Sequence, residues 1–384
     1  MIEHLPSDWR NAALVGRILA CDGPTPVMVA QGRLRDVSGA APTTSQLLSG
    51  WNGTPPDGRD LGPLEAIDFV RAWEGEGSVK LLAPVDLQCI KACGVTFAVS
   101  AVERVIEERA RGEANKAAAI RGALRDRVGA DIRSVRPGSP QASLLKEALI
   151  ADGLWSQYLE VAIGPDAEVF TKAPCLSSVG WGDFIGVRSD AVWTNPEPEI
   201  VIITDRGGRA LGAALGNDVN LRCIEGRSAL LLGKAKDNNA SCAIGPFIRL
   251  FDATFTIDDV RRAVVRLEVD GEDGFKLRGS SSMSLISRDP LELVGQTVGP
   301  HHQYPDGIAL FLGTMFAPTE DRDCHGQGFT HHMGDVVRVS CDKLGVLENK
   351  VTRCDAAPAW AFGLADLMDN LAARGLLQSN RKSA

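Results

Sequence analysis

Residues 195–220 of the chain, NPEPEIVIITDRGGRALGAALGNDVN, contain two apolar runs separated by a pair of glycines. The Gly207-Gly208 pair suits the turn of a two-residue β-hairpin, because both central residues of such a turn can need positive φ. A turn centred there places Glu197 directly opposite Asp218. Residues two apart share one face of a strand, so Glu199 points the same way as Glu197. The sequence therefore predicts three carboxylates on one face of this hairpin.

A divalent cation would explain why three carboxylates gather on apolar strands, since they would otherwise repel one another. Ligand sets made only of oxygen select hard cations, which favours Mg²⁺ and allows Mn²⁺. Three protein ligands leave about three positions of an octahedral shell for water or substrate, as in catalytic metal sites. The alternative is that the three acids lie exposed on an edge hairpin, and the residues alone leave both interpretations open.

The composition of the chain excludes several classes of protein. The 384 residues are 44% hydrophobic and 23% charged, with a net charge of −8 and nine scattered cysteines. These values are typical of a globular protein and argue against a general nucleic-acid or anionic-membrane binder. No apolar run has the roughly 18 residues of a spanning helix, and no signal peptide is recognisable. The chain is therefore expected to be cytoplasmic, with reduced thiols.

The character of the sequence changes near residue 77, which predicts a small N-terminal domain of short strands over 1–77 and a second domain over 78–384. The second domain mixes many strands with a few helices, so the fold class is α+β and rich in β-structure. Ser100 is expected to cap a helix that extends to about residue 126, with Glu103 closing a capping box. The remaining expected elements are helices at 142–151, at Asp289 onward with Glu292 closing its box, and at 362–377, and hairpins at 265–279 and 332–354.

Two further charged residues are candidates for proton transfer. Lys236 lies in the segment KAKDNN (234–239), and a lysine beside a dry metal site can have a lowered pKa and act as a base. A solvated turn is the alternative for this segment. Glu168 precedes Lys172 by four residues, and such a pair is more typical of a surface ion pair than of catalysis.

Together these residues resemble the fumarylacetoacetate hydrolase superfamily. That family carries a metal-binding E-x-E, an aspartate in an N-D motif about twenty residues on, and a later lysine before I-G-P. The matching segments here are 197–199, 217–220 and 236–246, with F-x-K-x-P at 170–174, G-T at 313–314 and G-D-x-V at 334–337. The resemblance covers about residues 79–351. It implies a mixed β-roll core with peripheral helices, a bound divalent cation and a homodimer or higher homo-oligomer.

One departure from the family pattern concerns the catalytic base. Hydrolases of the family carry a histidine in G-L-N-Y-x-x-H-A-x-E, and Ser100 stands at that position in GVTFAVSAVE (94–103). Serine is not a general base near neutral pH. A further metal-binding aspartate of the family has no counterpart near Cys93. Hydrolytic cleavage of a carbon–carbon bond by the usual residues is therefore not expected.

The subgroup without this histidine includes 2-keto-3-deoxy sugar-acid dehydratases, and the chain looks closest to those acting on pentonates (xylonate or arabinonate). The resemblance implies a small sugar-acid substrate, 2,5-dioxopentanoate as the product, and Glu168 with Lys236 as the catalytic pair. Which of the two is the acid and which the base stays open. Lys172, Ser100 and Thr314 are candidate substrate contacts.

Two other functions are compatible with the same residues. A hydrolase of 2,4-diketo-3-deoxy sugar acids would need a substitute base, and the candidates are five histidines in segments that read as loops: His301, His302, His325, His331 and His332. A sugar-acid binding protein would keep the metal but need neither Lys236 nor Glu168. A lysine variant that binds metal and ligand without turnover would favour the enzyme.

Overall fold

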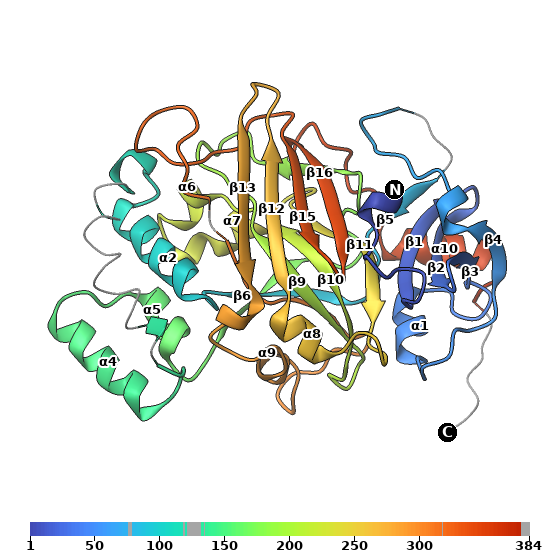
Figure 1. Cartoon of the computed structure of the whole chain (residues 1–384), viewed down its shortest axis with the longest axis horizontal. Coiled ribbons are helices and arrows are strands. Elements are labelled where there is room, and N and C mark those ends of the chain that lie inside the picture. The colour runs from blue at the N-terminus through green and yellow to red at the C-terminus, as the bar shows by residue number, and fades with distance from the viewer. Residues whose placement is uncertain (76–78, 118–119, 121–131, 134, 317, 378–384) are drawn as a thin grey trace.

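The computed structural model describes residues 1–75, 79–117, 120, 132–133, 135–316 and 318–377, which form two β-sheets with helices around them (Figure 1). The strands of the larger sheet are β1 (Leu14–Ala20), β2 (Gly23–Ala30), β3 (Arg33–Asp36), β4 (Arg59–Pro63), β5 (Lys80–Leu82), β6 (Cys89–Gly94), β7 (Glu168–Ala173), β9 (Pro198–Thr204), β10 (Ala210–Asp218), β11 (Cys242–Leu250) and β14 (Ile308–Phe311). Their order is β4-β3-β2-β1-β11-β10-β9-β14-β6-β7, and β5 pairs with β1.

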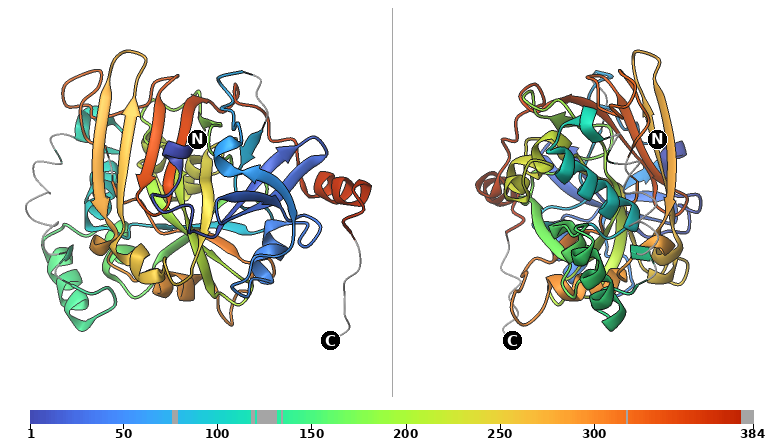
Figure 2. Two further views of the ribbon diagram at one scale, coloured as in Figure 1. Left: turned by 45° about the vertical axis from the view of Figure 1, so that its right-hand side comes forward. Right: turned by 90° about the vertical axis from the view of Figure 1, so that its left-hand side faces the viewer.

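The smaller sheet packs against the centre of the larger one (Figures 1 and 2). Its strands are β8 (Phe184–Val187), β12 (Val264–Asp270), β13 (Lys276–Ser282), β15 (Val336–Cys341) and β16 (Gly345–Arg353), in the order β13-β12-β15-β16-β8. Ile200 and Leu215 of the larger sheet belong to one apolar cluster with Leu267 and Val339 of the smaller sheet. Burial of such side chains between two sheets is the main stabilising term of the core. The predicted α+β, β-rich class is confirmed.

The helices lie at the ends and edges of the two sheets. They are α1 (Thr44–Ser49), α2 (Ala98–Ala110), α4 (Pro140–Ala151), α5 (Gln157–Ile163), α6 (Arg222–Glu225), α7 (Leu232–Lys236), α8 (Ile257–Arg262), α9 (Pro290–Thr297) and α10 (Leu364–Ala373), with short 3-10 turns at Ile2–His4, Leu64–Ala66, Ala229–Leu231 and Met283–Leu285. Helices α2, α4 and α5 gather at one end of the molecule, and α1 and α10 lie at the other (Figure 1). Among the described residues, no helix has the length and apolar character needed to span a bilayer.

The N-terminal strands are part of the larger sheet, because β1 pairs with β11 and aligns Leu14 with Arg249. The C-terminal helix α10 covers these strands, and Asn370 Nδ2 donates a hydrogen bond to the carbonyl of Asp22 at 2.7 Å. The division of the chain into domains at residues 77 and 78 stays a prediction.

The β9–β10 hairpin has the register that the sequence predicts, although its turn is different. Gly216 lies opposite Glu199, and the amide of Asp218 donates to the carbonyl of Glu197 at 3.0 Å. The expected two-residue turn is wrong: the amide of Asp205 bonds to the carbonyl of Arg209, and of the two glycines only Gly208 has a positive φ. A register shift between Ala210 and Gly212 compensates for the longer turn, so the carboxylates still face each other.

Helix α2 begins earlier and ends earlier than expected. It starts at Ala98 after Phe97, and Ser100 is the third helical residue: its hydroxyl accepts from the Phe97 amide at 3.3 Å. The expected cap at Ser100 with Glu103 closing the box is therefore wrong. The helix ends at Ala110 because Arg111 adopts a left-handed conformation, with φ of 52°. Residues 118–119 and 121–126 of the expected helix lie outside the described residues.

The other expected elements form near their predicted positions. Helix α4 starts at Pro140, two residues before the expected start, and α10 is shorter than the expected 362–377. Asp289 caps α9 by accepting from the Leu291 amide at 2.9 Å, but the carboxylate of Glu292 contacts Arg288 instead of closing a box. The two expected hairpins are β12–β13 and β15–β16.

A buried ion-pair cluster fixes the loop that enters β15. Asp335 is fully buried, and its carboxylate accepts hydrogen bonds from Arg322 Nη1 at 2.6 Å and Nη2 at 2.8 Å. Its Oδ2 also lies 3.1 Å from His331 Nδ1. Burial raises the pKa of Asp335, but the hydrogen bonds from His331 and Arg322 outweigh it and lower the pKa to about 2.

We expect Asp335→Asn to lower the free energy of unfolding by about 3 kcal/mol near neutral pH, because the buried Arg322 loses its buried carboxylate partner and keeps its ion pair with the exposed Asp273. Since the folded pKa is depressed, this contribution is present above the ordinary value of 3.8 and disappears as the pH falls toward about 2. Urea unfolding at several pH values measures it. The exposed Asp342, which pairs with Arg266 at 2.7 Å, offers a control variant, Asp342→Asn, with an expected effect within about 0.5 kcal/mol. An equal loss in both variants, or a loss that does not shrink in acid, would contradict the prediction.

Candidate active site

The hairpin register brings Glu197, Glu199 and Asp218 together at one end of β9 and β10. Each offers a carboxylate oxygen, and these oxygens lie within 4.8 Å of one another. The three residues are between 1% and 3% exposed, so the alternative of exposed acids on an edge hairpin is wrong. The side-chain amide of Asn217 supports the arrangement, because its oxygen accepts from the Glu197 amide at 3.1 Å.

Glu199 has the least compensated charge of the three. The amide of Gly313 donates to its Oε2 at 2.7 Å, and no ion pair neutralises it within the described part of the chain. Burial and the neighbouring carboxylates of Asp218 and Glu197 raise the pKa of Glu199 well above its ordinary value. A buried carboxylate beside two others, all with hard oxygen donors, fits a divalent cation such as Mg²⁺.

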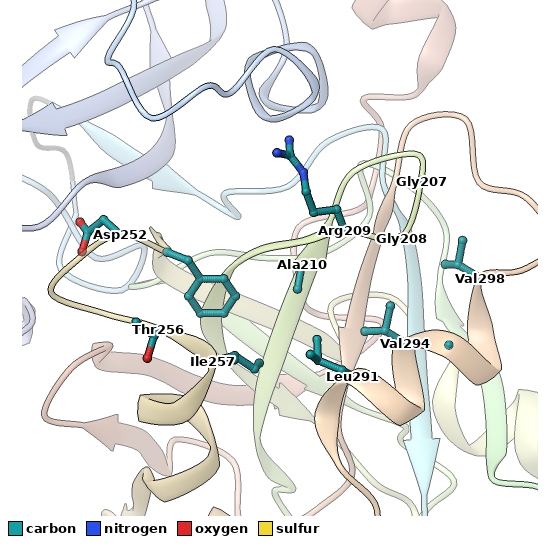
Figure 3. Close-up of a pocket in the computed structure, with 12 residues that line it drawn as sticks. Gly207, Gly208, Arg209, Ala210, Asp252, Thr256, Ile257, Leu291, Val294 and Val298 are labelled. Carbon is teal, nitrogen blue, oxygen red and sulfur yellow. The ribbon is translucent and has the colours of Figure 1, made fainter.

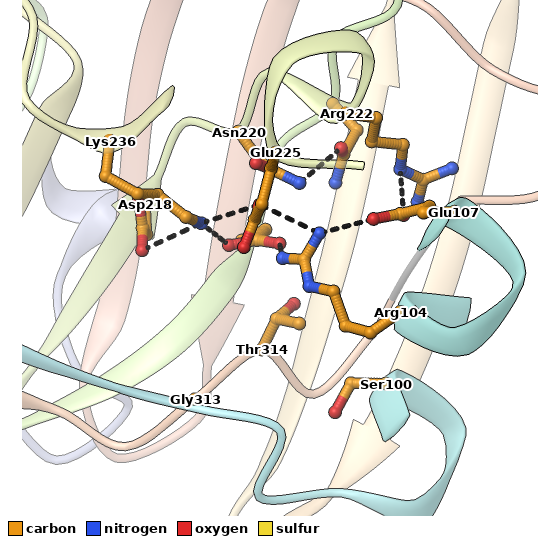
Figure 4. A network of polar contacts seen from close by, with 12 residues as sticks. Ser100, Arg104, Glu107, Asp218, Asn220, Arg222, Glu225, Lys236, Gly313 and Thr314 are labelled. Carbon is orange, nitrogen blue, oxygen red and sulfur yellow. Dashed lines mark hydrogen bonds and ion pairs between the residues drawn. The ribbon is translucent and has the colours of Figure 1, made fainter. Parts of the chain in front are cut away.

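Lys236 is the last residue of α7 and points into this group of carboxylates. It is 2% exposed, so the solvated turn considered for its segment is wrong. Its Nζ contacts Glu197 Oε2 and lies 3.2 Å from Asp218 Oδ2 (Figure 4). Burial alone would lower the pKa of Lys236, but Asp218 and Glu197 outweigh burial and raise it. The lowered pKa expected from the sequence is therefore not found without a bound cation.

Strand β7 presents Glu168, Phe170 and Lys172 on one face, because they alternate along the strand. Lys172 is fully buried: its Nζ lies 3.0 Å from Asp218 Oδ1 and also donates to the carbonyl of Lys236. The surface pairing considered for Glu168 and Lys172 is therefore wrong. The ring of Phe170 lies under Lys236, with 6.0 Å between Nζ and the ring centroid.

Glu168 is the first residue of β7 and lies opposite Gly94 of β6. A Cβ atom at position 94 would lie only 1.9 Å from Glu168 Oε2, so the carboxyl group occupies the space that glycine leaves free. Burial raises the pKa of Glu168, and Arg104 and Lys236 oppose this only in part. In the described residues its carboxyl group has no hydrogen bond, and a carboxyl group in this state suits proton donation.

A network around Arg104 completes the site, and the sequence interpretation missed it (Figure 4). Arg104 Nη2 contacts Glu197 Oε1 at 2.5 Å, and Nη1 contacts Glu107 Oε2 at 2.6 Å and Glu225 Oε2 at 2.9 Å. Burial raises the pKa of Glu225 to about 7, against the effect of Arg104 and Lys236. Arg222 Nε lies 3.2 Å from Glu107 Oε1. Alternating charges on a helix such as α2 are typical of a solvated face, but these residues are buried.

Ser100 and Thr314 lie next to this network and are engaged with backbone groups (Figure 4). The Ser100 hydroxyl donates to the Phe97 carbonyl at 2.8 Å, and the Thr314 hydroxyl donates to the Phe316 carbonyl at 3.1 Å. Their expected role as substrate contacts stays a prediction, as does that of Lys172.

The five histidines considered as substitute bases are paired with other carboxylates or exposed. His331 bonds to Asp335, His332 pairs with Asp273 and Asp323, and His325 pairs with Asp321. His301 and His302 are exposed. Among the described residues, no hydrogen bond or ion pair joins any of the five to Glu197, Glu199 or Asp218.

A groove of about 740 Å³ lies elsewhere, beside the turn between β9 and β10 (Figure 3). Its lining is mostly apolar and comes from α8, α9 and the segment 207–210, with Ile257, Leu291 and Val294 pointing into it. It contains none of the carboxylates described above, so it is separate from the candidate active site.

Comparison with known proteins finds a family model that matches part of the chain. Residues 165–352 match the model described as "Fumarylacetoacetate (FAA) hydrolase C-terminal". The match to this family is the one that the sequence motifs predict.

Two curated relatives match over part of their length. A probable 2-keto-3-deoxyxylonate dehydratase of Haloferax volcanii is 34% identical over 200 residues, which are 51% of this chain and 63% of the relative. A 2-dehydro-3-deoxy-D-arabinonate dehydratase of Saccharolobus solfataricus is 30% identical over 189 residues, which are 48% of this chain and 59% of the relative. The matches thus span about three fifths of these relatives.

Solved structures share the fold. A 2-keto-3-deoxy-D-arabinonate dehydratase complexed with magnesium and 2,5-dioxopentanoate has a TM-score of 0.61 at 19% identity, covering 88% of this chain and 99% of its own. A fumarylacetoacetate hydrolase from Exiguobacterium antarcticum has a TM-score of 0.55 at 18% identity, covering 89% of this chain and 100% of its own.

Proposed function

We propose that the protein is a Mg²⁺-dependent dehydratase that converts 2-keto-3-deoxy-D-pentonate (the xylonate or arabinonate form) to 2,5-dioxopentanoate. The observation that carries the proposal is the position of Lys236 between Glu197 and Asp218, with the protonatable Glu168 close by and no histidine at position 100. The two curated relatives carry names for this activity, and the solved neighbour is complexed with magnesium and the product.

The cation, with Mn²⁺ as a possible substitute for Mg²⁺, would be held by Glu197, Glu199 and Asp218. When bound it would polarise the 2-keto group and stabilise the negative charge that develops as C3 loses a proton. Gly313 supports this site by holding Glu199 through its amide, and Lys172 supports it by its contact with Asp218.

Lys236 is the proposed base and Glu168 the proposed acid. A cation shared by Glu197 and Asp218 would reduce their attraction for the ammonium group, so Lys236 could release its proton and then take one from C3. Glu168, whose raised pKa favours the protonated form, would give its proton to the C4 hydroxyl as it leaves as water. The resulting 3-ene then tautomerises to 2,5-dioxopentanoate. The product therefore differs from the substrate by the loss of one water molecule.

A coupled assay tests the proposal. We expect purified protein with Mg²⁺ and 2-keto-3-deoxy-D-pentonate to support NAD(P)⁺ reduction by a 2,5-dioxopentanoate dehydrogenase, because the aldehyde product is that enzyme's substrate. EDTA should remove the signal and added Mg²⁺ should restore it. Release of pyruvate from a 2,4-diketo acid, with no signal in this assay, would indicate the hydrolase instead. Binding of the sugar acid without any turnover would indicate a binding protein. The homodimer or higher homo-oligomer and the cytoplasmic location stay predictions.

A further inference from the structure

Arg104 and Lys236 each contact a different carboxylate oxygen of Glu197. Arg104 Nη2 contacts Oε1 at 2.5 Å, and Lys236 Nζ contacts Oε2. The Lys236 ammonium also lies 3.2 Å from Asp218 Oδ2, so it occupies space between two of the three proposed metal ligands. A cation bound by these carboxylates would have to compete with Lys236, whereas the contact of Arg104 with the other oxygen can persist.

Arg104 is itself held in place from two further directions. Its Nη1 contacts Glu107, one turn along α2, and Glu225 of α6. Glu107 is in turn fixed by Arg222, whose Nε lies 3.2 Å from Glu107 Oε1. The guanidinium is planar, presents a fixed fork of donors and stays charged at all physiological pH values. Three carboxylates, one on α2, one on α6 and one just before β9, therefore determine where it points.

We propose that Arg104 is a positioning residue: by fixing Oε1 of Glu197, it keeps Oε2 turned toward Glu199 and Asp218, where a divalent cation binds. The proposal rests on the metal site of the proposed function. Outer residues that orient metal ligands commonly contribute about tenfold to a hundredfold to metal affinity. Neither the motifs of the family nor the comparisons assign this role to Arg104.

The test uses Mn²⁺ alone as the probe and full-length protein, so that it does not depend on turnover. Arg104→Lys keeps the positive charge but replaces the fork by a single ammonium group, which cannot contact all three carboxylates in the same geometry. Arg109→Lys is the matched control, because Arg109 lies on the same helix but is exposed and donates to the Gly153 carbonyl at 3.2 Å. Calorimetric titration gives the Mn²⁺ affinity, and the electron paramagnetic resonance spectrum reports how uniform the coordination is.

We expect Arg104→Lys to weaken Mn²⁺ binding by about tenfold and to broaden the spectrum, while Arg109→Lys matches the wild type. A folded Arg104→Lys protein with the same Mn²⁺ affinity and the same spectrum as the wild type would overturn the proposal. If that variant does not fold, as judged by circular dichroism, Glu107→Gln replaces it: Arg104 then stays but loses one charged anchor, and a smaller change in the same direction is expected. An unchanged Glu107→Gln protein would equally overturn it.

The same experiment separates this proposal from the proposed function. Wild-type protein that binds Mn²⁺ but does not dehydrate the sugar acid would refute the proposed activity. The ratio of the Mn²⁺ affinities of the wild type and Arg104→Lys would still decide the role of Arg104. Wild-type protein that binds no Mn²⁺ would refute both.

Discussion

The Lys236→Met protein is expected to lose dehydratase turnover by about a thousandfold while it still binds the metal. Lys236 is the only cation in the described residues that contacts both Glu197 and Asp218, and its proposed role is to remove the C3 proton. Methionine fills a similar volume but cannot accept a proton. Since the ammonium competes with a cation for two carboxylates, its removal should leave Mn²⁺ affinity equal or higher.

Lys234→Met is the matched control for this experiment. Lys234 lies two residues earlier in α7, is exposed, and pairs with the exposed Asp190 at 3.1 Å. Its removal should leave both turnover and Mn²⁺ affinity unchanged, because exposed ion pairs contribute little. Turnover in Lys236→Met within about tenfold of the wild type would exclude this lysine as the base, since general bases contribute about a hundredfold or more.

Glu199→Gln is expected to weaken Mg²⁺ and Mn²⁺ binding by about a hundredfold or more, and to abolish turnover at ordinary metal concentrations. Glutamine has the shape of glutamate, and its carbonyl oxygen can still accept a hydrogen bond from the Gly313 amide. In the wild type this amide donates to Glu199 Oε2 at 2.7 Å. What it lacks is the negative charge that a hard divalent cation requires. Isothermal titration with each metal measures the change in affinity.

Thermal unfolding provides the control for Glu199→Gln. Without metal, the variant should be at least as stable as the wild type, because it removes one of three neighbouring buried carboxylates that repel one another. With excess Mg²⁺, only the wild type should gain stability, by about 2.7 kcal/mol at a metal concentration of 100 times Kd. A variant that Mg²⁺ still stabilises as much as it stabilises the wild type would show that Glu199 is not a ligand.

The three carboxylates could be predicted from the sequence because strand geometry is strongly periodic. A turn near Gly207 and Gly208 was enough to place Glu197 opposite Asp218. The turn itself was predicted wrongly, since Asp205 closes a longer loop with Arg209, and the register survived because the strand absorbs the difference just after Ala210. The alternation of side chains along a strand predicts which residues share a face even when the turn is predicted wrongly. The turn type depends on local hydrogen bonds, which this alternation does not reveal.

The second half of the site could not be predicted from the same kind of pattern. Arg104 and Glu107 belong to a helix whose charges at i, i+3 and i, i+4 are equally typical of a solvated surface. Only the packing of α2 against α6 and the contact of Arg104 with Glu197 turn them into a buried network. One signal was present in the sequence: Ser100, Arg104 and Glu107 share a face of the helix, and Ser100 stands where the family places a catalytic histidine.

The lysine was recognised as a candidate, but its electrostatic environment was not. A lowered pKa was expected because burial disfavours a charged lysine, and the structure instead surrounds Lys236 with carboxylates that raise its pKa. A sequence shows which residue types are near one another along the chain. The balance between burial and opposite charge depends on distances of a few ångströms, which the fold alone decides.

The contact between Gly94 and Glu168 also has an evolutionary consequence. A Cβ atom at position 94 would lie 1.9 Å from one oxygen of Glu168 and 2.6 Å from its carboxyl carbon, so no other residue fits there while the carboxyl group keeps its place. The two residues belong to different strands, 74 positions apart in the chain, yet they are opposite partners in the sheet. A side chain at position 94 would therefore have to displace the carboxyl group of Glu168, so a lineage that keeps this carboxyl group in its place should also keep glycine at position 94.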